Sequence, residues 1–160
     1  MCYTISMDRK TACFFSGNRE IEDDEERLKQ RINVFVFGVR MMGATTFLVG
    51  GARGFDMLAA ESVLSFKNTD PKVRLILVQP CREQTKGWED EDIKRYERIK
   101  KEADEVVCLS EEYYQGCMHV RNRYLVDNAD YGIVYSRKEE GGTTYTLSYA
   151  EKKGKKIFKL

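Results

Sequence analysis

The chain has 160 residues, a length that suits one domain able to bury a core without metals or disulfides. Its 27 Lys and Arg residues against 26 Asp and Glu give a formal charge of +1, so no overall field draws it to nucleic acid or to an anionic membrane. The 5 cysteines are odd in number and form no CxxC pair, which favours reduced thiols and a cytoplasmic location. No apolar run reaches the roughly 18 residues of a membrane span, and no apolar signal region leads the chain, so we expect neither a membrane protein nor a secreted one.

The first segment predicts a polar arm followed by a buried strand. Residues 1–10 are polar and predict a loose arm within a single domain over 1–160. The apolar run over 11–15 predicts a strand, and it leads directly into residues 16–19, which contain a glycine and read as a turn.

A long helix is predicted next, over residues 23–42. Acidic residues crowd its first turn and basic residues follow, which is the polarity that a helix dipole favours, and Gly43 ends it. Apolar residues recur at steps of three and four and predict one core-facing stripe. The stripe consists of Leu28, Ile32, Phe35, Val36, Val39 and Met42.

The chain is organised around residues 47–56, FLVGGARGFD. A short apolar run stops at Gly50 and Gly51 and resumes after Gly54 as an Ala- and Leu-rich helix to about residue 67. Glycine lets backbone N–H groups approach a ligand closely, and the new helix directs its positive end at the same point, so this corner suits a phosphate. The alternative is that the glycines only make a compact strand-to-helix turn.

Strands and helices continue to alternate to the end of the chain. The pattern predicts strands over 73–78, 105–109, 131–135 and 156–160, and helices over 89–103, 118–128 and from residues 141–144 to about 153. Such alternation predicts an α/β fold, a Rossmann-like three-layer sandwich with a mostly parallel sheet of about six strands and helices on both faces. Ligands bind such sheets at the carboxyl ends of the strands, where several of the glycine-rich and polar turns of this chain are predicted to meet.

Four motifs resemble a known family. They are GGA-x-GFD at 50–56, Q-x-x-x-W at 84–88, GCM-x-x-RNRY-x-VD at 116–127 and GGT at 141–143. Together they resemble the YpsA-like branch of the SLOG superfamily over nearly the whole chain. That superfamily also contains the SMF/DprA DNA-processing proteins and the LOG cytokinin-activating phosphoribohydrolases, and the resemblance implies a Rossmann-like domain that binds nucleotides or nucleotide-derived ligands. It implies a ligand class and not a reaction.

Two departures from the relatives bear on catalysis. Most relatives in this branch carry Ser/Thr-Gly-His-Arg, whereas this chain has Asn18, which hydrogen-bonds but cannot act as the histidine would. The LOG enzymes resemble the chain at Arg121 and at 141–143, but they carry a glutamate about one turn further into the helix, and residues 144–150 hold no carboxylate here. Because N-glycosidic hydrolysis needs such a group near the developing oxocarbenium, this loss weakens assignment as a LOG-type enzyme.

Several side chains keep two interpretations. Arg121 suits a bidentate phosphate contact, with an internal ion pair as the alternative. Asp56 either caps the following helix or accepts a ribose hydroxyl, and Trp88 either stacks a base or anchors the core. Arg123 stays undecided between ligand binding and packing. His119, the only histidine, has no partners at ligand spacing, so we expect no metal site.

The sequence therefore predicts binding or sensing of a nucleotide or nucleotide-derived ligand of phosphate or ADP-ribose type, with Arg121 and either Arg19 or Arg53 neutralising phosphate. A nucleotide N-glycosidic hydrolase with Asp56 as the substitute carboxylate is the alternative, and the near-neutral charge disfavours DprA-like DNA binding. We expect a nucleotide-derived small molecule as the partner, no cofactor and no membrane, and a homo-oligomer stays an option. The predicted ligand-binding residues are Ser16, Gly17, Asn18, Arg19, Gly50, Gly51, Ala52, Gly54, Asp56, Gln79, Arg121, Asn122, Gly141, Gly142 and Thr143.

Overall fold

Strands and helices alternate throughout residues 11–160, the part of the chain that the computed structural model describes. The strands are β1 (Thr11–Gly17), β2 (Ala44–Val49), β3 (Arg74–Gln79), β4 (Glu105–Cys108), β5 (Tyr131–Tyr135) and β6 (Lys156–Lys159). The helices are α1 (Glu25–Met41), α2 (Phe55–Thr69), α3 (Asp90–Glu102), α4 (Cys117–Asp127) and α5 (Gly142–Lys152). Each element lies where the sequence predicts it, with ends shifted by a few residues. The predicted arm over 1–10 lies outside the described residues. None of the described helices is both long and apolar enough to cross a membrane.

The six strands form one sheet in which every neighbouring pair is parallel, in the order β4-β3-β2-β1-β5-β6. The chain therefore begins at β1 inside the sheet, adds three strands on one side, and returns past β1 to add β5 and β6 on the other. The direction of growth reverses between β1 and β5, which is where an open parallel sheet leaves a crevice at its carboxyl edge. The predicted Rossmann-like fold is confirmed, and its sheet is parallel throughout the described residues.

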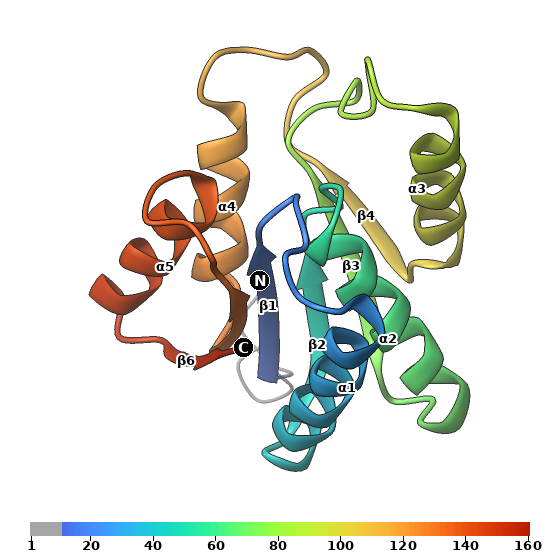
Figure 1. Cartoon of the computed structure of the whole chain (residues 1–160), viewed down its shortest axis with the longest axis vertical. Coiled ribbons are helices and arrows are strands. Elements are labelled where there is room, and N and C mark those ends of the chain that lie inside the picture. The colour runs from blue at the N-terminus through green and yellow to red at the C-terminus, as the bar shows by residue number, and fades with distance from the viewer. Residues whose placement is uncertain (1–10) are drawn as a thin grey trace, which may run out of the picture.

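Helices cover both faces of this sheet (Figure 1). The first three pack in succession on one face, α1 against α2 and α2 against α3, and α4 packs against α5 on the other. Side chains alternate along a strand, so neighbours in sequence serve different cores. Phe15 and Phe47 belong to the larger buried cluster under α1 to α3, whereas Phe14 and Leu48 belong to the smaller cluster under α4 and α5.

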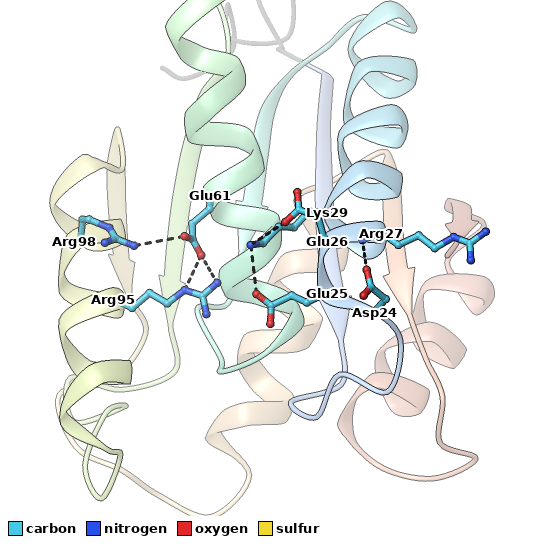
Figure 2. Close-up of polar contacts among 8 residues, drawn as sticks. All are labelled: Asp24, Glu25, Glu26, Arg27, Lys29, Glu61, Arg95 and Arg98. Carbon is cyan, nitrogen blue, oxygen red and sulfur yellow. Dashed lines mark hydrogen bonds and ion pairs between the residues drawn. The ribbon is translucent and has the colours of Figure 1, made fainter.

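The first helix shows why the early charges predict a helix start. Asp24 is the N-cap residue, and its carboxylate accepts a 2.8 Å hydrogen bond from the Arg27 backbone N–H, while Lys29 pairs with Glu25 one turn earlier at 3.4 Å (Figure 2). Four members of the predicted stripe are buried, namely Leu28, Ile32, Val36 and Val39. The stripe ends there, since Met42 is the C-cap residue and is 41% exposed, so its predicted place in the core is wrong.

Candidate functional site

A cleft of about 290 Å³ opens at the point where the strand order reverses between β1 and β5. We call it the switch-point cleft. Segments from both halves of the sheet build it: the loop after β1, the start of α2, one side of α4 and the loop that leads into α5. The predicted residues that line it are Ser16, Gly17, Asn18, Arg19, Ala52, Asp56, Arg121, Asn122, Gly141, Gly142 and Thr143. The predicted residues that do not line it are Gly50, Gly51, Gly54 and Gln79.

Arg121 reaches this cleft from α4 and is only 5% exposed. Its Nη1 donates a 2.6 Å hydrogen bond to the carbonyl oxygen of Gly50 and a longer one, 3.4 Å, to that of Val78. Its Nε donates to the Asn122 side-chain oxygen at 2.9 Å. Within residues 11–160 the Nη2 group has only the Met118 sulfur, at 3.8 Å, which is a weak acceptor. Nη1 is therefore held by carbonyl oxygens and Nε by an amide oxygen, and the Nη2 group keeps spare hydrogen-bonding capacity.

Two carboxylates on α2 and α4, the helices that carry Asp56 and Arg121, are engaged with other residues. Glu61 pairs with Arg95 and Arg98 of α3, as Figure 2 shows, and Asp127 accepts a 2.9 Å hydrogen bond from the Tyr149 hydroxyl. Among the described residues Arg121 has no ion pair within 4.0 Å, and burial lowers the pKa of its guanidinium. The direct ion pair considered from the sequence is thus absent from this part of the chain. Arg121 is a buried cation that feels the charge of Asp56 but has no carboxylate in direct contact among the described residues.

Asp56 lies in the first turn of α2 and is 5% exposed. Its Oδ2 accepts a 3.1 Å hydrogen bond from the Ala52 backbone N–H, so the carboxyl group holds the preceding loop and does not cap its own helix. Its Oδ1 is buried and has no hydrogen-bond partner among residues 11–160. Burial raises the pKa of Asp56 to about 6, although the charges of Arg121 and Arg19 oppose this rise. The cleft therefore contains a carboxyl group with one unused acceptor.

Asn18 forms hydrogen bonds with segments on both sides of the reversal point. Its side-chain oxygen accepts a 2.6 Å hydrogen bond from the Arg137 backbone N–H, and its Nδ2 donates to the Thr143 hydroxyl at 3.4 Å. Its own backbone bonds the end of β5, through the Tyr135 carbonyl, and the start of α2, through the Phe55 N–H. Asn18 thus has a structural role that the sequence comparison with histidine does not indicate.

The glycine corner combines close approach with a turn. An ideal Cβ at Gly50 would stand 2.6 Å from the Arg121 Cζ, so only glycine lets that guanidinium lie where it does. Gly51 has φ +73°, and a Cβ there would stand 2.7 Å from Leu77 and 2.9 Å from Tyr96 in the core. Both glycines therefore serve packing, and direct contact of their N–H groups with a ligand stays a prediction.

Other residues considered from the sequence, predicted or undecided, lie outside the switch-point cleft. Gln79 donates a 2.6 Å hydrogen bond to the buried Tyr96 hydroxyl, and Arg123 donates one of 2.7 Å to the Tyr145 hydroxyl, which ties α4 to α5. The Arg53 guanidinium lies over the Trp88 ring, 5.4 Å from its centroid, in a neighbouring cleft. No group of three or more His, Cys, Asp or Glu residues within 11–160 is arranged to hold a metal.

Sequence reasoning missed part of the lining. The residues concerned are Phe15, Glu20, Met118, Leu125, Lys138 and Glu140. Lys138 and Glu140 belong to the charged loop after β5, and the Lys138 ammonium lies 3.3 Å from the carboxylate of Glu20, which also lines the cleft. That loop lies directly after a strand and before a helix that begins at glycine. This position could have identified it as part of the cleft lining.

The chain matches the YpsA family model, described as the YspA SLOG family, over residues 18–159. It is also 33% identical over 114 residues to the UPF0398 protein of Halalkalibacterium halodurans. That similarity covers 69% of this chain and 60% of the relative, so the chain spans well under the relative's full length.

Two solved structures resemble the fold. The DNA processing protein A of Helicobacter pylori, described for its single-stranded DNA binding mode, gives a TM-score of 0.68 at 21% identity and covers 98% of this chain and 68% of its own. The same protein from Streptococcus pneumoniae gives 0.66 at 16% identity and covers 93% of this chain and 50% of its own. At such identities the likeness establishes a shared fold.

Proposed function

This chain belongs to the YpsA family of SLOG proteins, and from that premise we propose that its switch-point cleft binds a nucleotide or a nucleotide-derived ligand by a phosphate group. The observation that carries the proposal is Arg121, a buried guanidinium that lines the cleft without an ion pair in the described chain. Leaving a buried charge unpaired is costly, so an anion entering the cleft would gain a strong partner. A guanidinium whose Nη2 group has no strong acceptor in the described chain suits a phosphate oxygen.

The start of α5 supports the same ligand. Gly141, Gly142 and Thr143 line the cleft, and α5 begins at Gly142 with no side-chain cap and no acidic residue in its first turn. The first N–H groups of a helix lack partners inside the helix, and its positive dipole end favours an anion. Arg121 and the α5 N-terminus would thus share one phosphate.

The free acceptor of Asp56 suits the sugar. A ribose hydroxyl is a hydrogen-bond donor that a buried carboxyl oxygen could accept, and Oδ1 of Asp56 has no such donor among residues 11–160. A ligand that carries phosphate and ribose together would satisfy both unpartnered groups of the cleft. This reasoning supports nucleotides over inorganic phosphate.

Titration calorimetry with a thermal-shift screen tests the proposal, using nucleoside monophosphates, NAD, ADP-ribose and cyclic dinucleotides. Ligand at 100 times its Kd should add about 2.7 kcal/mol to the free energy of unfolding. Arg121→Ala should lose the response, whereas Arg98→Ala, which removes an exposed arginine of α3 outside the cleft, should keep it. Absence of binding across the whole screen would contradict the proposal.

A second candidate, hydrolysis of a nucleotide N-glycosidic bond, is favoured by the position of Asp56. Its carboxyl group shares the cleft with Arg121, and a pKa of about 6 lets it exchange a proton near neutral pH. It would replace the glutamate that LOG enzymes carry on the helix after the glycine-rich turn. Release of free base from nucleoside monophosphates separates this activity from binding alone.

DNA binding is the weakest of the three functions. The lining of the switch-point cleft pairs three carboxyl groups, Glu20, Asp56 and Glu140, with three basic side chains, Arg19, Arg121 and Lys138, so it has no excess of positive charge for a polyanion. The described cysteines are free thiols, which suits a reducing compartment; they are Cys13, Cys81, Cys108 and Cys117. We therefore propose that the ligand is a cytoplasmic nucleotide.

A further inference from the structure

A second cleft, of about 400 Å³, adjoins the first. We call it the tryptophan cleft, and Arg53, Trp88, Gln84 and Cys81 line it. Arg19 and Met118 line both clefts and form the boundary between them. A ligand held by phosphate in the switch-point cleft could therefore extend past these two side chains into the tryptophan cleft.

The tryptophan cleft offers a fixed flat surface. The Trp88 ring is half-buried and meets the Tyr96 ring edge-on, with centroids 5.6 Å apart, so the indole cannot turn freely. The buried Gln84 side chain, which also lines this cleft, is held in place by two hydrogen bonds. Its Nε2 donates to the Gly50 carbonyl at 2.8 Å, and its Oε1 accepts from the Tyr96 hydroxyl at 3.1 Å. The same carbonyl accepts the hydrogen bond of Arg121, so one backbone oxygen anchors both clefts.

Arg53 supplies a second planar group. Its guanidinium lies over the indole, 5.4 Å from the ring centroid, and its side chain has no hydrogen bond or ion pair to any other residue of the described chain. Guanidinium and indole planes both stack on aromatic rings, and such stacking tolerates any base. Nothing else in the described part of the chain holds Arg53, so a ring can lie against the indole at little cost.

We propose that the tryptophan cleft holds the planar base of the ligand, stacked on Trp88 and Arg53, while the phosphate of the same molecule lies at Arg121. The inference rests on the proposed function, and it adds that the ligand is a nucleotide with an intact aromatic base and not a sugar phosphate. Arg19, exposed at the boundary of the two clefts, would face the linking sugar phosphate.

Trp88 allows a direct test, because it is the only tryptophan in the chain. AMP and ribose 5-phosphate serve as probes, since they share the phosphate and the sugar and differ in the base. We expect AMP to quench the fluorescence of the wild-type protein and ribose 5-phosphate to leave it unchanged. From the worth of one base stacked on an aromatic side chain, AMP should bind about tenfold tighter or more.

Two variants extend the test. Trp88→Leu should weaken AMP binding to the level of ribose 5-phosphate and leave the affinity for ribose 5-phosphate itself unchanged. Arg53→Met keeps the tryptophan reporter and should weaken only AMP, so it remains informative if Trp88→Leu fails to fold. Equal affinity for both probes, without quenching by AMP, would overturn this inference and leave the phosphate site intact. Binding of neither probe would overturn this inference, and absence of binding across the whole nucleotide screen would overturn both proposals.

Discussion

Arg121 and Gly50 are in direct contact, and the contact depends on the absence of a side chain at position 50. The guanidinium Nη1 lies 2.6 Å from the Gly50 carbonyl oxygen, and an added Cβ would stand 2.6 Å from both Cζ and Nη1. The Gly50 carbonyl thereby positions a cation that comes from a helix 71 residues later in the sequence. The glycine corner thus contributes to the site by making room for Arg121.

Gly50→Ala should displace Arg121 without breaking the turn. The backbone at Gly50 is not in the left-handed region, so alanine is tolerated there, but its methyl group must push the guanidinium away. We expect the affinity for nucleoside monophosphates to fall about tenfold, the equivalent of one lost hydrogen bond to a charged group. Calorimetry measures the affinity, and circular dichroism should show unchanged helix content. Full affinity in this variant would mean that the position of Arg121 does not matter for the ligand.

Arg121→Lys and Arg121→Ala separate charge from geometry. Lysine keeps the charge and loses the fork of parallel donors, so it should bind phosphate with intermediate affinity, and alanine should cost roughly 1.5 to 3 kcal/mol of binding. Melting curves provide the control, since the Gly50 carbonyl still accepts from Gln84 after the arginine is gone. A lower melting temperature with undiminished ligand affinity would remove Arg121 from the site.

Asp56→Asn should stabilise the protein at neutral pH and not at acidic pH. The pKa of Asp56 is about 6 in the folded protein against 3.8 for an ordinary aspartate, so the folded state holds the proton more tightly. Ionised Asp56 therefore costs stability, fully above pH 6 and not at all below about pH 3.8, with a maximum of roughly 3 kcal/mol. Melting temperatures at pH 4 and pH 8 measure it. The variant should gain several degrees at pH 8 only, and an equal gain at both values would point to another cause.

The wild-type protein should release no free base from AMP above background. The helix after Gly142 lacks the glutamate of LOG enzymes, and Asp56 is the carboxyl group in the cleft that lies close enough to Arg121 to feel its charge. Chromatography of long incubations at high protein concentration detects the base. Many turnovers per protein molecule would instead establish the hydrolase, and Asp56→Asn should then abolish them while nucleotide binding persists.

Much of this fold could be predicted because its signals are local. Apolar runs that end at glycine, and acidic residues that lead a helix, place each described element within a few residues of its position, and parallel pairing then brings the strand ends together. The convergence of residues 16–19 with 141–143 in one cleft follows from that logic alone. Met42 shows the limit, because helical spacing does not reveal where the last turn ends.

Side-chain contacts between different elements could not be predicted. The sequence treats Arg19 and Arg53 as equal candidates for phosphate, yet Arg53 lies on Trp88 in the neighbouring cleft. Glu61 is unavailable to Arg121 because it pairs with arginines of α3, and those pairs form only because α2 and α3 pack together. Pairings of this kind depend on how helices far apart in sequence pack together, which neither composition nor spacing encodes.

The bonds of Asn18 also set the order in which the site can form. Its side chain is joined to residues 119 and 125 positions further along the chain. A growing polypeptide that has completed β1, the glycine corner and Asp56 therefore still lacks one wall of the cleft until α5 has been synthesised. Closing so long a loop is entropically costly and slow, so the cleft is among the last features to form. Nucleotide added during refolding should leave the early steps unchanged and slow the unfolding of the finished protein.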